Sequence, residues 1–502
     1  MKLAKSIIFL FFSFISFQLT SQTINHFWSV NFNSTSSLLG GAVVAGQGEN
    51  TSIYYNPATI TEMETGSNLS FTSSLFTWNT YKYADMLGEG TKLKSSNFNA
   101  QPPFISFAYK PKISNISLAA VILTRAKEDF ELSWNNSAYY DVLTHLPGVE
   151  KYDAAFDHRN YYNDTWVGIA MAHELSPSFS YGITLFGSGA TLKYLYLYSA
   201  SAYSINDTLD PALYPQSKRI AEGTYSESFR FTEYRLIIKG GVSYKTGKWK
   251  FGLNVTTPSM HLFSSGNEAS RAKLNSNISI STTEFIPDFL INDAQKGSDL
   301  KTKFKTPFSV SIGLIRDIGS KNKRLYIAAE YYAPIKGYKM IDAQLNTDIA
   351  LPYIYDALDN KDWLSFASST RAFVNVVVGY SWKIREHLQF LNSIRTDLSS
   401  IQNASLGDYS TYNLQKTSSY NMYHYSAGWR FNIKKNSFIA GGQVSFGYAK
   451  NHKQAANFTE PLEINLDDDT VLQGPLENKM NSRYLGFNLY IGATLNFLKN
   501  GK

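Results

Sequence analysis

Apolar and polar residues alternate with a period of two along most of this chain after Gly66. The pattern is clear near the C-terminus in SRYLGFNLYIGATLNFL, where every second residue between 487 and 497 is apolar. It recurs in KWKFGLNVT (248–256) and in SYNMYHYSAGWRFNI (419–433). Strict alternation predicts β-strands that have one apolar face and one polar face.

Short and long connections alternate between these segments. Turn-forming residues mark short connections near 111–114, 176–177, 245–248, 319–322, 383–386 and 434–436. Long polar segments lie near 79–102, 134–158, 200–222, 257–301, 334–369, 399–418 and 451–481. Six short turns and seven long loops predict about fourteen strands, with both termini on the short-turn side. This asymmetry is typical of outer-membrane barrels.

Composition supports a membrane barrel over a soluble or helical protein. Charged residues make up 17% of the 502 residues and aromatic residues 15%, whereas an ordinary soluble domain carries about 25% charged residues. No later apolar run reaches the roughly 20 residues of a membrane helix. There are no cysteines, which excludes disulfides and thiolate sites. The net charge of +7 is spread without a dense basic tract, so no nucleic-acid partner is predicted.

The first 21 residues have the layout of a secretory signal peptide. Lys2 and Lys5 precede an apolar core at 7–17, and small or polar residues follow up to Ser21. We therefore predict three parts: a signal peptide at 1–21, an N-terminal hatch at 22–66, and a transmembrane barrel with long extracellular loops at 67–499. The expected location is the outer membrane of a Gram-negative-type envelope.

A closed sheet is the form of β-structure that a membrane allows, because open strand edges find no hydrogen-bond partners in lipid. The soluble alternatives are a large propeller and a multi-domain β-sandwich. No repeat of about 40–50 residues is visible, and no composition shift or linker marks a domain border. The prediction is an all-β fold: a transmembrane antiparallel β-barrel of about 14 strands with a hatch in its lumen. Two outer segments, 282–295 and 351–367, have spacings that suit short helices or plain loops, and both interpretations stay open.

The segment 22–66 is too short to form a core of its own. Its apolar stretch at 38–45 needs cover, which favours a plug inside the barrel over a free tail. GGAVVAGQGENTSIYYNPATI (40–60) resembles the N-terminal motif of the FadL/TodX family of outer-membrane transporters for hydrophobic substrates, with its Asn-Pro-Ala turn at 56–58. Segments 304–332, 388–400 and 423–448 extend the resemblance over most of the mature chain. Thr59, where the family usually has Gly, and several loop lengths depart from it.

The resemblance implies a fourteen-stranded barrel blocked by a hatch, with substrate entering from the outer loops and leaving sideways through the wall. It implies passive uptake of hydrophobic or amphipathic molecules such as long-chain fatty acids or aromatic hydrocarbons. We predict a protein in outer-membrane lipid that is not an enzyme, and whether it is a monomer stays open. One alternative is a barrel that assists a protein secretion or assembly machinery, and another is a barrel hydrolase. The proposed hatch motif is Tyr54, Tyr55, Asn56, Pro57 and Ala58; its alternative is an ordinary turn before the first strand.

Charged residues on the polar faces are candidates for the lumen. If the apolar faces contact lipid, the polar faces of several strands place seven charged side chains inside. They either tie the wall to the hatch, or Arg235 or Arg395 binds a substrate carboxylate. These lumen or substrate-binding candidates are Glu233, Arg235, Lys239, Glu330, Arg395, Asp397 and Arg430.

No other catalytic or metal-binding pattern stands out. The eight histidines are dispersed without metal-ligand spacing, so no metal and no cofactor is predicted, and specificity for haem stays open. GSGA at 187–190 lacks the Lys-Ser/Thr ending of a phosphate loop, and a Gly-x-Ser-x-Gly elbow is missing.

Overall fold

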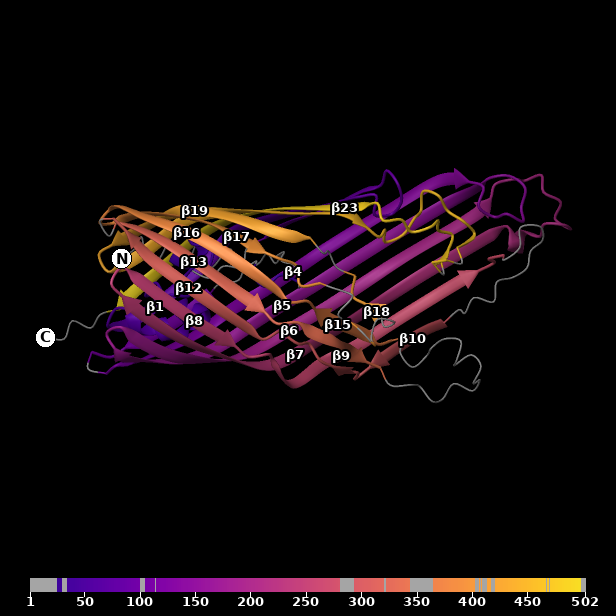
Figure 1. The fold of residues 1–502 in the computed structure, drawn as a ribbon. Coiled ribbons are helices and arrows are strands. Elements are labelled where there is room, and N and C mark those ends of the chain that lie inside the picture. The colour runs from indigo at the N-terminus through magenta and orange to yellow at the C-terminus, as the bar shows by residue number, and fades with distance from the viewer. Residues whose placement is uncertain are drawn as a thin grey trace, which may run out of the picture.

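One antiparallel sheet forms the wall of the molecule (Figure 1). The structure, a computed structural model, describes residues 25–28, 34–99, 104–112, 114–279, 293–319, 322–343, 364–401, 406, 408, 413–416, 420–465, 467–468 and 470–497. The predicted signal peptide at 1–21 lies outside these residues, as does most of the two segments with helical spacing.

The sheet holds seventeen strands that make fourteen wall strands, because three wall strands each consist of two consecutive pieces. The split wall strands are β2 with β3, β8 with β9, and β10 with β12. The strands are β1 (Gly66–Ala84), β2 (Lys92–Asn99), β3 (Phe104–Lys110), β4 (Ile116–Tyr140), β5 (Glu150–Ser176), β6 (Phe179–Ser204), β7 (Ile220–Thr246), β8 (Trp249–Thr256), β9 (Met260–Ser276), β10 (Asp293–Ser298), β12 (Ser309–Ile318), β13 (Lys323–Tyr332), β16 (Phe373–Arg385), β17 (Leu388–Asp397), β19 (Asn421–Ile433), β20 (Asn436–His452) and β23 (Met480–Phe497).

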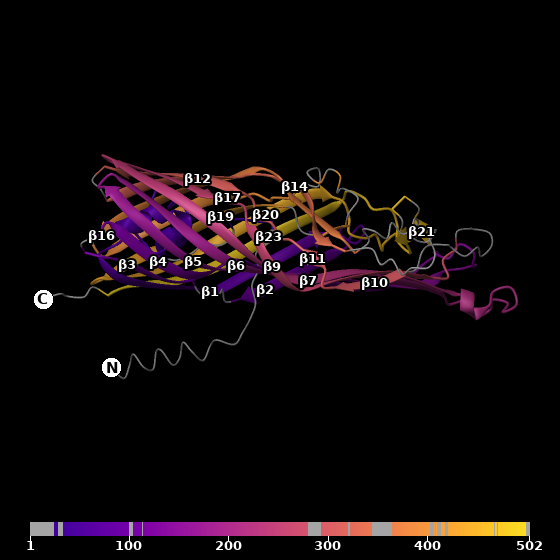
Figure 2. The same cartoon turned by 90° about the horizontal axis from the view of Figure 1, so that it is seen from below.

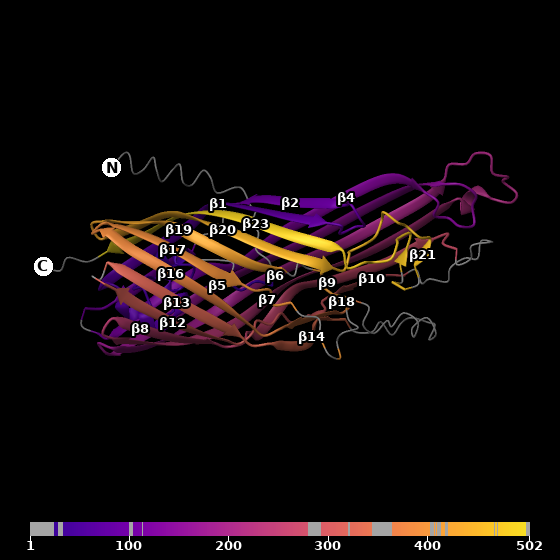
Figure 3. The same cartoon turned by 45° about the horizontal axis from the view of Figure 1, so that its top comes forward.

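The first and last wall strands close the sheet into a barrel. β1 pairs with β23 from Ser67 opposite Phe497 to Ala84 opposite Asn481 (Figure 3). Closure removes the sheet edge, so every wall strand has a neighbour on each side. The predicted all-β barrel of fourteen strands is confirmed.

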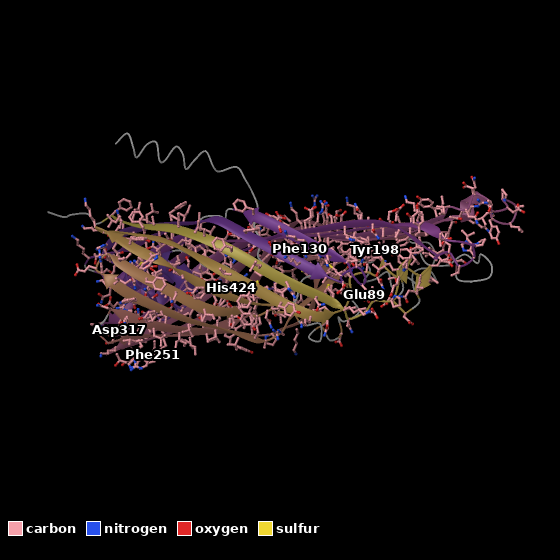
Figure 4. The ribbon with its side chains drawn as sticks, turned by 90° about the horizontal axis from the view of Figure 1, so that it is seen from above. Glu89, Phe130, Tyr198, Phe251, Asp317 and His424 are labelled. Atoms are coloured by element: carbon pink, nitrogen blue, oxygen red, sulfur yellow. The ribbon has the colours of Figure 1, made fainter. Side chains whose placement is uncertain are left out.

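An apolar belt surrounds the barrel near its short-turn end. On β5, for example, the outward side chains of Val167 and Ile169 are 54% and 63% exposed. Farther along the same face the outward residues become charged, with Asp157 and Arg159. Phe251 and Asp317 lie together near one end of the barrel, and Glu89 lies beyond the middle of the molecule towards the opposite end (Figure 4). A closed barrel with such a belt is a membrane-spanning barrel of the outer-membrane type.

Strands β4 to β7 are much longer than a membrane requires, which corrects one expectation. They contain 25 to 27 residues each, whereas a span takes about 9–11. The segment 134–158, expected to be a long polar connection, is mostly strand, because its polar residues face water while its inward residues pack in the lumen. Figure 1 shows these strands projecting past the shorter strands β12 to β19.

The predicted short turns join strands at one end of the barrel, as at Pro177–Ser178 between β5 and β6. In the described part of the chain, no helix combines the length and the apolar character needed to cross a membrane.

Two layers fill the lumen. At the short-turn end lie α2 (Ser34–Leu38), α3 (Ser52–Tyr55) and the 3-10 helix η1 (Pro57–Glu62), buried against the wall. Towards the other end a second sheet folds inward from the outer connections (Figure 2). This inner sheet consists of β11 (Lys301–Thr302), β14 (Ile335–Asp342), β15 (Phe366–Thr370) and β18 (Asn413–Leu414). A separate two-stranded sheet pairs β21 (Ile464–Asn465) with β22 (Thr470–Val471). The short 3-10 helix η2 (Gln216–Lys218) lies between β6 and β7 in the chain.

Candidate functional site

Asn56 is the residue that links the hatch to itself and to the wall. Its side chain is fully buried and caps η1 by accepting a hydrogen bond from the Ala58 backbone N–H at 3.1 Å. Its Nδ2 donates to the backbone oxygens of Val44, at 2.7 Å, and of Val242 on β7, at 3.0 Å. Pro57 occupies the first position of η1, where a missing N–H costs nothing.

Glycines in the wall let the hatch backbone come close. A Cβ on Gly252 of β8 would lie 2.2 Å from the Val44 oxygen, and one on Gly241 would lie 2.0 Å from Asn56 Oδ1. Either contact is far inside van der Waals range, so only glycine fits. At these glycines the hatch therefore packs directly against the backbone of the wall.

Four of the seven predicted charged residues contact the N-terminal segment. Lys239 Nζ donates to the Tyr54 backbone oxygen at 2.8 Å and lies 4.0 Å from the centre of its ring. Trp28 Nε1 donates to Glu330 at 2.7 Å, while the backbone N–H groups of Phe27 and Trp28 donate to Asp397 Oδ1 at 3.2 and 3.1 Å.

Arg430 adds an ion pair to this set, with its Nη1 at 3.1 Å from Glu49 Oε1. Asp397 also has His26 and His424 as neighbours, with ring nitrogens at 3.6 and 3.8 Å from Oδ2. Figure 4 shows His424 midway along the barrel. These contacts correspond to the interpretation in which lumenal charges tie the wall to the hatch.

The other three predicted residues serve different neighbourhoods. Arg395 is buried, donates to Gln443 at 3.1 Å, and lines a small cavity with Tyr55 and Trp28. Glu233 lies 2.6 Å from His261 Nδ1 on β9. Arg235 joins a cluster above the hatch. The seven residues are therefore all lumenal, but they do not form a single site.

The cluster around Arg235 contains residues that the sequence did not single out. Asp164 on β5 is fully buried; its Oδ1 lies 2.7 Å from Arg235 Nη2, and its Oδ2 lies 3.9 Å from Arg125 Nη1. Ser188 donates to the same carboxylate at 2.6 Å. Asp164 therefore shares its charge between two guanidinium groups.

A partly open cavity lies beside this cluster. Its lining combines aromatic rings, a methionine, hydroxyl groups and two cations, a mixture suited to amphipathic ligands. The Arg125 guanidinium lies 4.6 Å from the centre of the Phe27 ring. Lining residues include Phe27, Arg125, Tyr162, Phe304, Lys305 and Met340.

Arg125 also marks an irregularity in the wall. The pairing of β4 with β5 shifts between Thr124 and Ala126, so Arg125 is an extra residue in β4. Beyond it the ladder on the other side of β4 ends: β3 pairs with β4 over five residues, whereas in the described residues β2 lies beside β4 but forms ladder pairs only with β1. Asn97 Nδ2 donates to the Asp129 backbone oxygen across this gap.

The register slip at Arg125 shows in the burial pattern of β4 and not in the sequence. Buried and outward positions alternate regularly from Ser117 to Leu123, and then Arg125 and Ala126 are both buried. A slip of one residue in an alternating pattern is what a bulge produces. Asp164 and Phe304 left no signal in the sequence either, because the residues that they meet come from distant strands.

Comparisons with known proteins were made by sequence and by structure. No family model matches the chain. A search of curated proteins finds no match either.

Solved structures match over nearly the whole chain. A FadL homologue from Pseudomonas aeruginosa has a TM-score of 0.57 at 10% identity and covers 94% of this chain and 100% of that one. The toluene transporter TodX of Pseudomonas putida gives 0.54 at 12% identity, with 94% and 100% covered. The Ralstonia pickettii toluene transporter TbuX gives 0.53 at 11%, with 93% and 99%. At these identities the likeness establishes the fold.

No group of three or more His, Cys, Asp or Glu in the described ranges is arranged to hold a metal ion.

Proposed function

We propose that this protein is a passive transporter of hydrophobic or amphipathic small molecules in the outer membrane of a Gram-negative-type envelope. The observation that carries the proposal is the combination of an apolar-belted closed barrel, a buried hatch, and a mixed cavity next to a gap in the wall. A hatch fixed to the wall on several sides does not suit a water-filled pore.

In the proposed route, substrate enters the cavity from the outer side and leaves through the gap between β2–β3 and β4. The physical reason is that an apolar molecule avoids water along this path, which favours it by about 0.8 kcal/mol per buried CH₂. Arg125 lies both at the cavity and at the bulge that adjoins the gap, so the two ends of the route meet at one residue.

The proposed substrates are long-chain fatty acids and small aromatic hydrocarbons. The fold match includes proteins named as toluene transporters, and the rings that line the cavity suit apolar ligands. The cationic side chains of Arg125 and Lys305, which line the cavity, suit a carboxylate head group. We propose no enzymatic step and no cofactor.

Uptake by intact cells tests the proposal. Cells that express the protein are given radiolabelled palmitate or toluene and are compared with an empty-vector strain, after the folded barrel is confirmed in the outer membrane. We expect faster uptake of at least one of the two compounds. Equal uptake of both compounds by the two strains would refute the proposal, and stoichiometric co-purifying proteins would favour a secretion or assembly role.

A further inference from the structure

The barrel wall has a second interruption, far from the gap beside β4. β8 pairs with β12 over residues 249–256 and 309–316, and β9 pairs with β10 over 268–273 and 293–298. Between these two ladders, residues 257–267 and 299–308 form no ladder pair with each other, although all of them are described.

The interruption arises because the eighth wall strand turns into the lumen. Between β10 and β12 the chain forms β11, which pairs with β14 of the inner sheet. Hydrogen bonds close the interruption only at its ends. Asn267 Nδ2 donates to the Leu300 oxygen at 2.9 Å, and the Thr306 backbone N–H donates to Ser259 Oγ at 2.9 Å.

The two sides of the interruption differ: the facing segment exposes Lys301, Lys303 and Lys305, whereas the β9 side is apolar. Met260, Leu262 and Phe263 are 41%, 53% and 56% exposed. The ring of Phe263 stacks on that of Tyr234 with their centres 4.4 Å apart. One step farther out, Arg230 and Glu268 form an exposed ion pair at 2.8 Å, which marks the start of the polar surface. The interruption therefore lies at the outer edge of the apolar belt, where acyl chains meet head groups.

The inner side of the interruption is the wall of the cavity. Phe304 and Thr306, on the inward detour, both line the cavity. Phe304 is held from within by Arg235, whose Nη1 donates to its oxygen at 3.5 Å and whose guanidinium lies 5.2 Å from the centre of its ring. His261, 40% exposed, reaches from this rim to the buried carboxylate of Glu233. The thin segment 304–306 lines the cavity on this side.

We propose that this interruption is a second lateral port, through which a single-chain amphiphile such as a fatty acid passes between the outer leaflet and the cavity. The inference rests on the proposed function. A tail enters past Phe263 and Phe304, and the polar end stays near Lys305 and Arg125.

Disulfide locks test the port, because the chain has no native cysteine. Ser259→Cys with Thr306→Cys closes the second interruption, and Asn97→Cys with Asp129→Cys closes the gap beside β4. The matched control is Val255→Cys with Val310→Cys, two lipid-facing residues directly opposite in the intact ladder of β8 and β12. Transfer of palmitate from donor vesicles into proteoliposomes is measured with each pair oxidised and then reduced.

We expect the oxidised 259–306 lock to slow transfer about threefold or more, with recovery on reduction, since a closed gate blocks its route. The port is refuted if transfer with the oxidised 259–306 lock is as fast as with the 255–310 control, while the 97–129 lock abolishes transfer. That result would leave the proposed function intact. If the unmodified protein transfers no palmitate, both the port and the proposed function are refuted.

A second variant keeps the test decisive if the locked protein does not fold. Phe304→Ala removes the ring from the thin segment and keeps its backbone hydrogen bond, so transfer should rise about twofold or more. Correct folding is checked by heat-dependent mobility on gels. An unchanged rate in a folded Phe304→Ala protein would contradict the port.

Discussion

Asn56 is the clearest case of one side chain with several structural duties. It caps η1 through its oxygen and joins Val44 of the hatch to Val242 of the wall through its nitrogen. The sequence predicted a turn at Asn56 and Pro57, because proline fixes its own φ and restricts its neighbour. The two donor contacts were not predictable, since they join residues separated by 12 and 186 positions.

Substitution of Asn56 should loosen the hatch. Asn56→Asp keeps the cap on Ala58 but removes both donors and buries a charge, whereas Asn56→Ala removes all three contacts. We expect both variants to lose about 1–3 kcal/mol in the free energy of unfolding and to conduct more ions in planar bilayers. Wild-type conductance and melting temperature in both variants would contradict the role of Asn56.

Glu227 shows how the part of the barrel beyond the membrane depends on charge. Burial alone would raise the pKa of its carboxyl, but Lys416 and Arg271, with hydrogen bonds from Tyr194 and Tyr225, outweigh burial and lower the pKa to about 2. Lys416 comes from the outer connection 413–416, at 3.0 Å from Glu227 Oε1. This carboxylate therefore pins an outer segment to β7.

The sign of the pH effect follows from the lowered pKa. The ion cluster stabilises the fold fully above the unfolded pKa near 4.5, and its contribution falls as pH drops towards about 2. The shift corresponds to about 3 kcal/mol. Wild-type protein should lose stability over this window, whereas Glu227→Gln should be less stable at pH 7 and should lose less stability between pH 4.5 and 2. Melting temperatures in detergent check this, and identical pH profiles would refute it.

At the scale of elements, the bulge at Arg125 controls how β4 runs beside its neighbours. Deletion of Arg125 should restore a regular register with β5 and let β4 approach β2. Arg125→Gly is the matched variant, because it keeps the extra residue and removes only the cation. We expect the deletion to slow palmitate transfer about tenfold by closing the gap, and the glycine variant to slow it less. Equal rates in the two variants would contradict this role of the bulge.

The fit between hatch and wall also belongs to this scale. Gly252→Val would place a side chain on the Val44 oxygen, while Gly240→Val adds one at a position with nothing within 4 Å. We expect the first to displace the hatch and lower the unfolding free energy by about 1–3 kcal/mol, and the second to change it little. Thermal melts and protease access to the hatch measure the difference, and two equally stable variants would count against a close fit.

The strands that could be predicted from the sequence are those with a clear period-two pattern of apolar residues. The alternating segment 487–497 placed its apolar residues outward, as expected, because that signal is local to one strand. The end of β4 and the start of β5 were predicted to be a polar loop. Their outward residues are polar because this part of the wall faces water, so the sequence lacks the apolar outer face of a membrane strand. The cluster of Arg125, Asp164 and Arg235 depends on register across several strands, which one sequence does not reveal.

At the scale of the whole molecule, the alternation of short and long connections predicted the number of wall strands. It also predicted that the short turns lie at one end of the barrel. Closure followed from the physics of lipid, which leaves no place for a strand edge. The inner sheet of β11, β14, β15 and β18 was not foreseen, because short strands from separate connections carry no common pattern.

The most direct test of a hydrophobic route through a plugged barrel compares two permeants in one preparation. Proteoliposomes containing the wild-type protein are assayed for palmitate transfer and for swelling in a small sugar. The account predicts palmitate transfer well above protein-free vesicles, with sugar permeability equal to theirs. Rapid sugar permeation without palmitate transfer would show a water-filled pore and contradict the account.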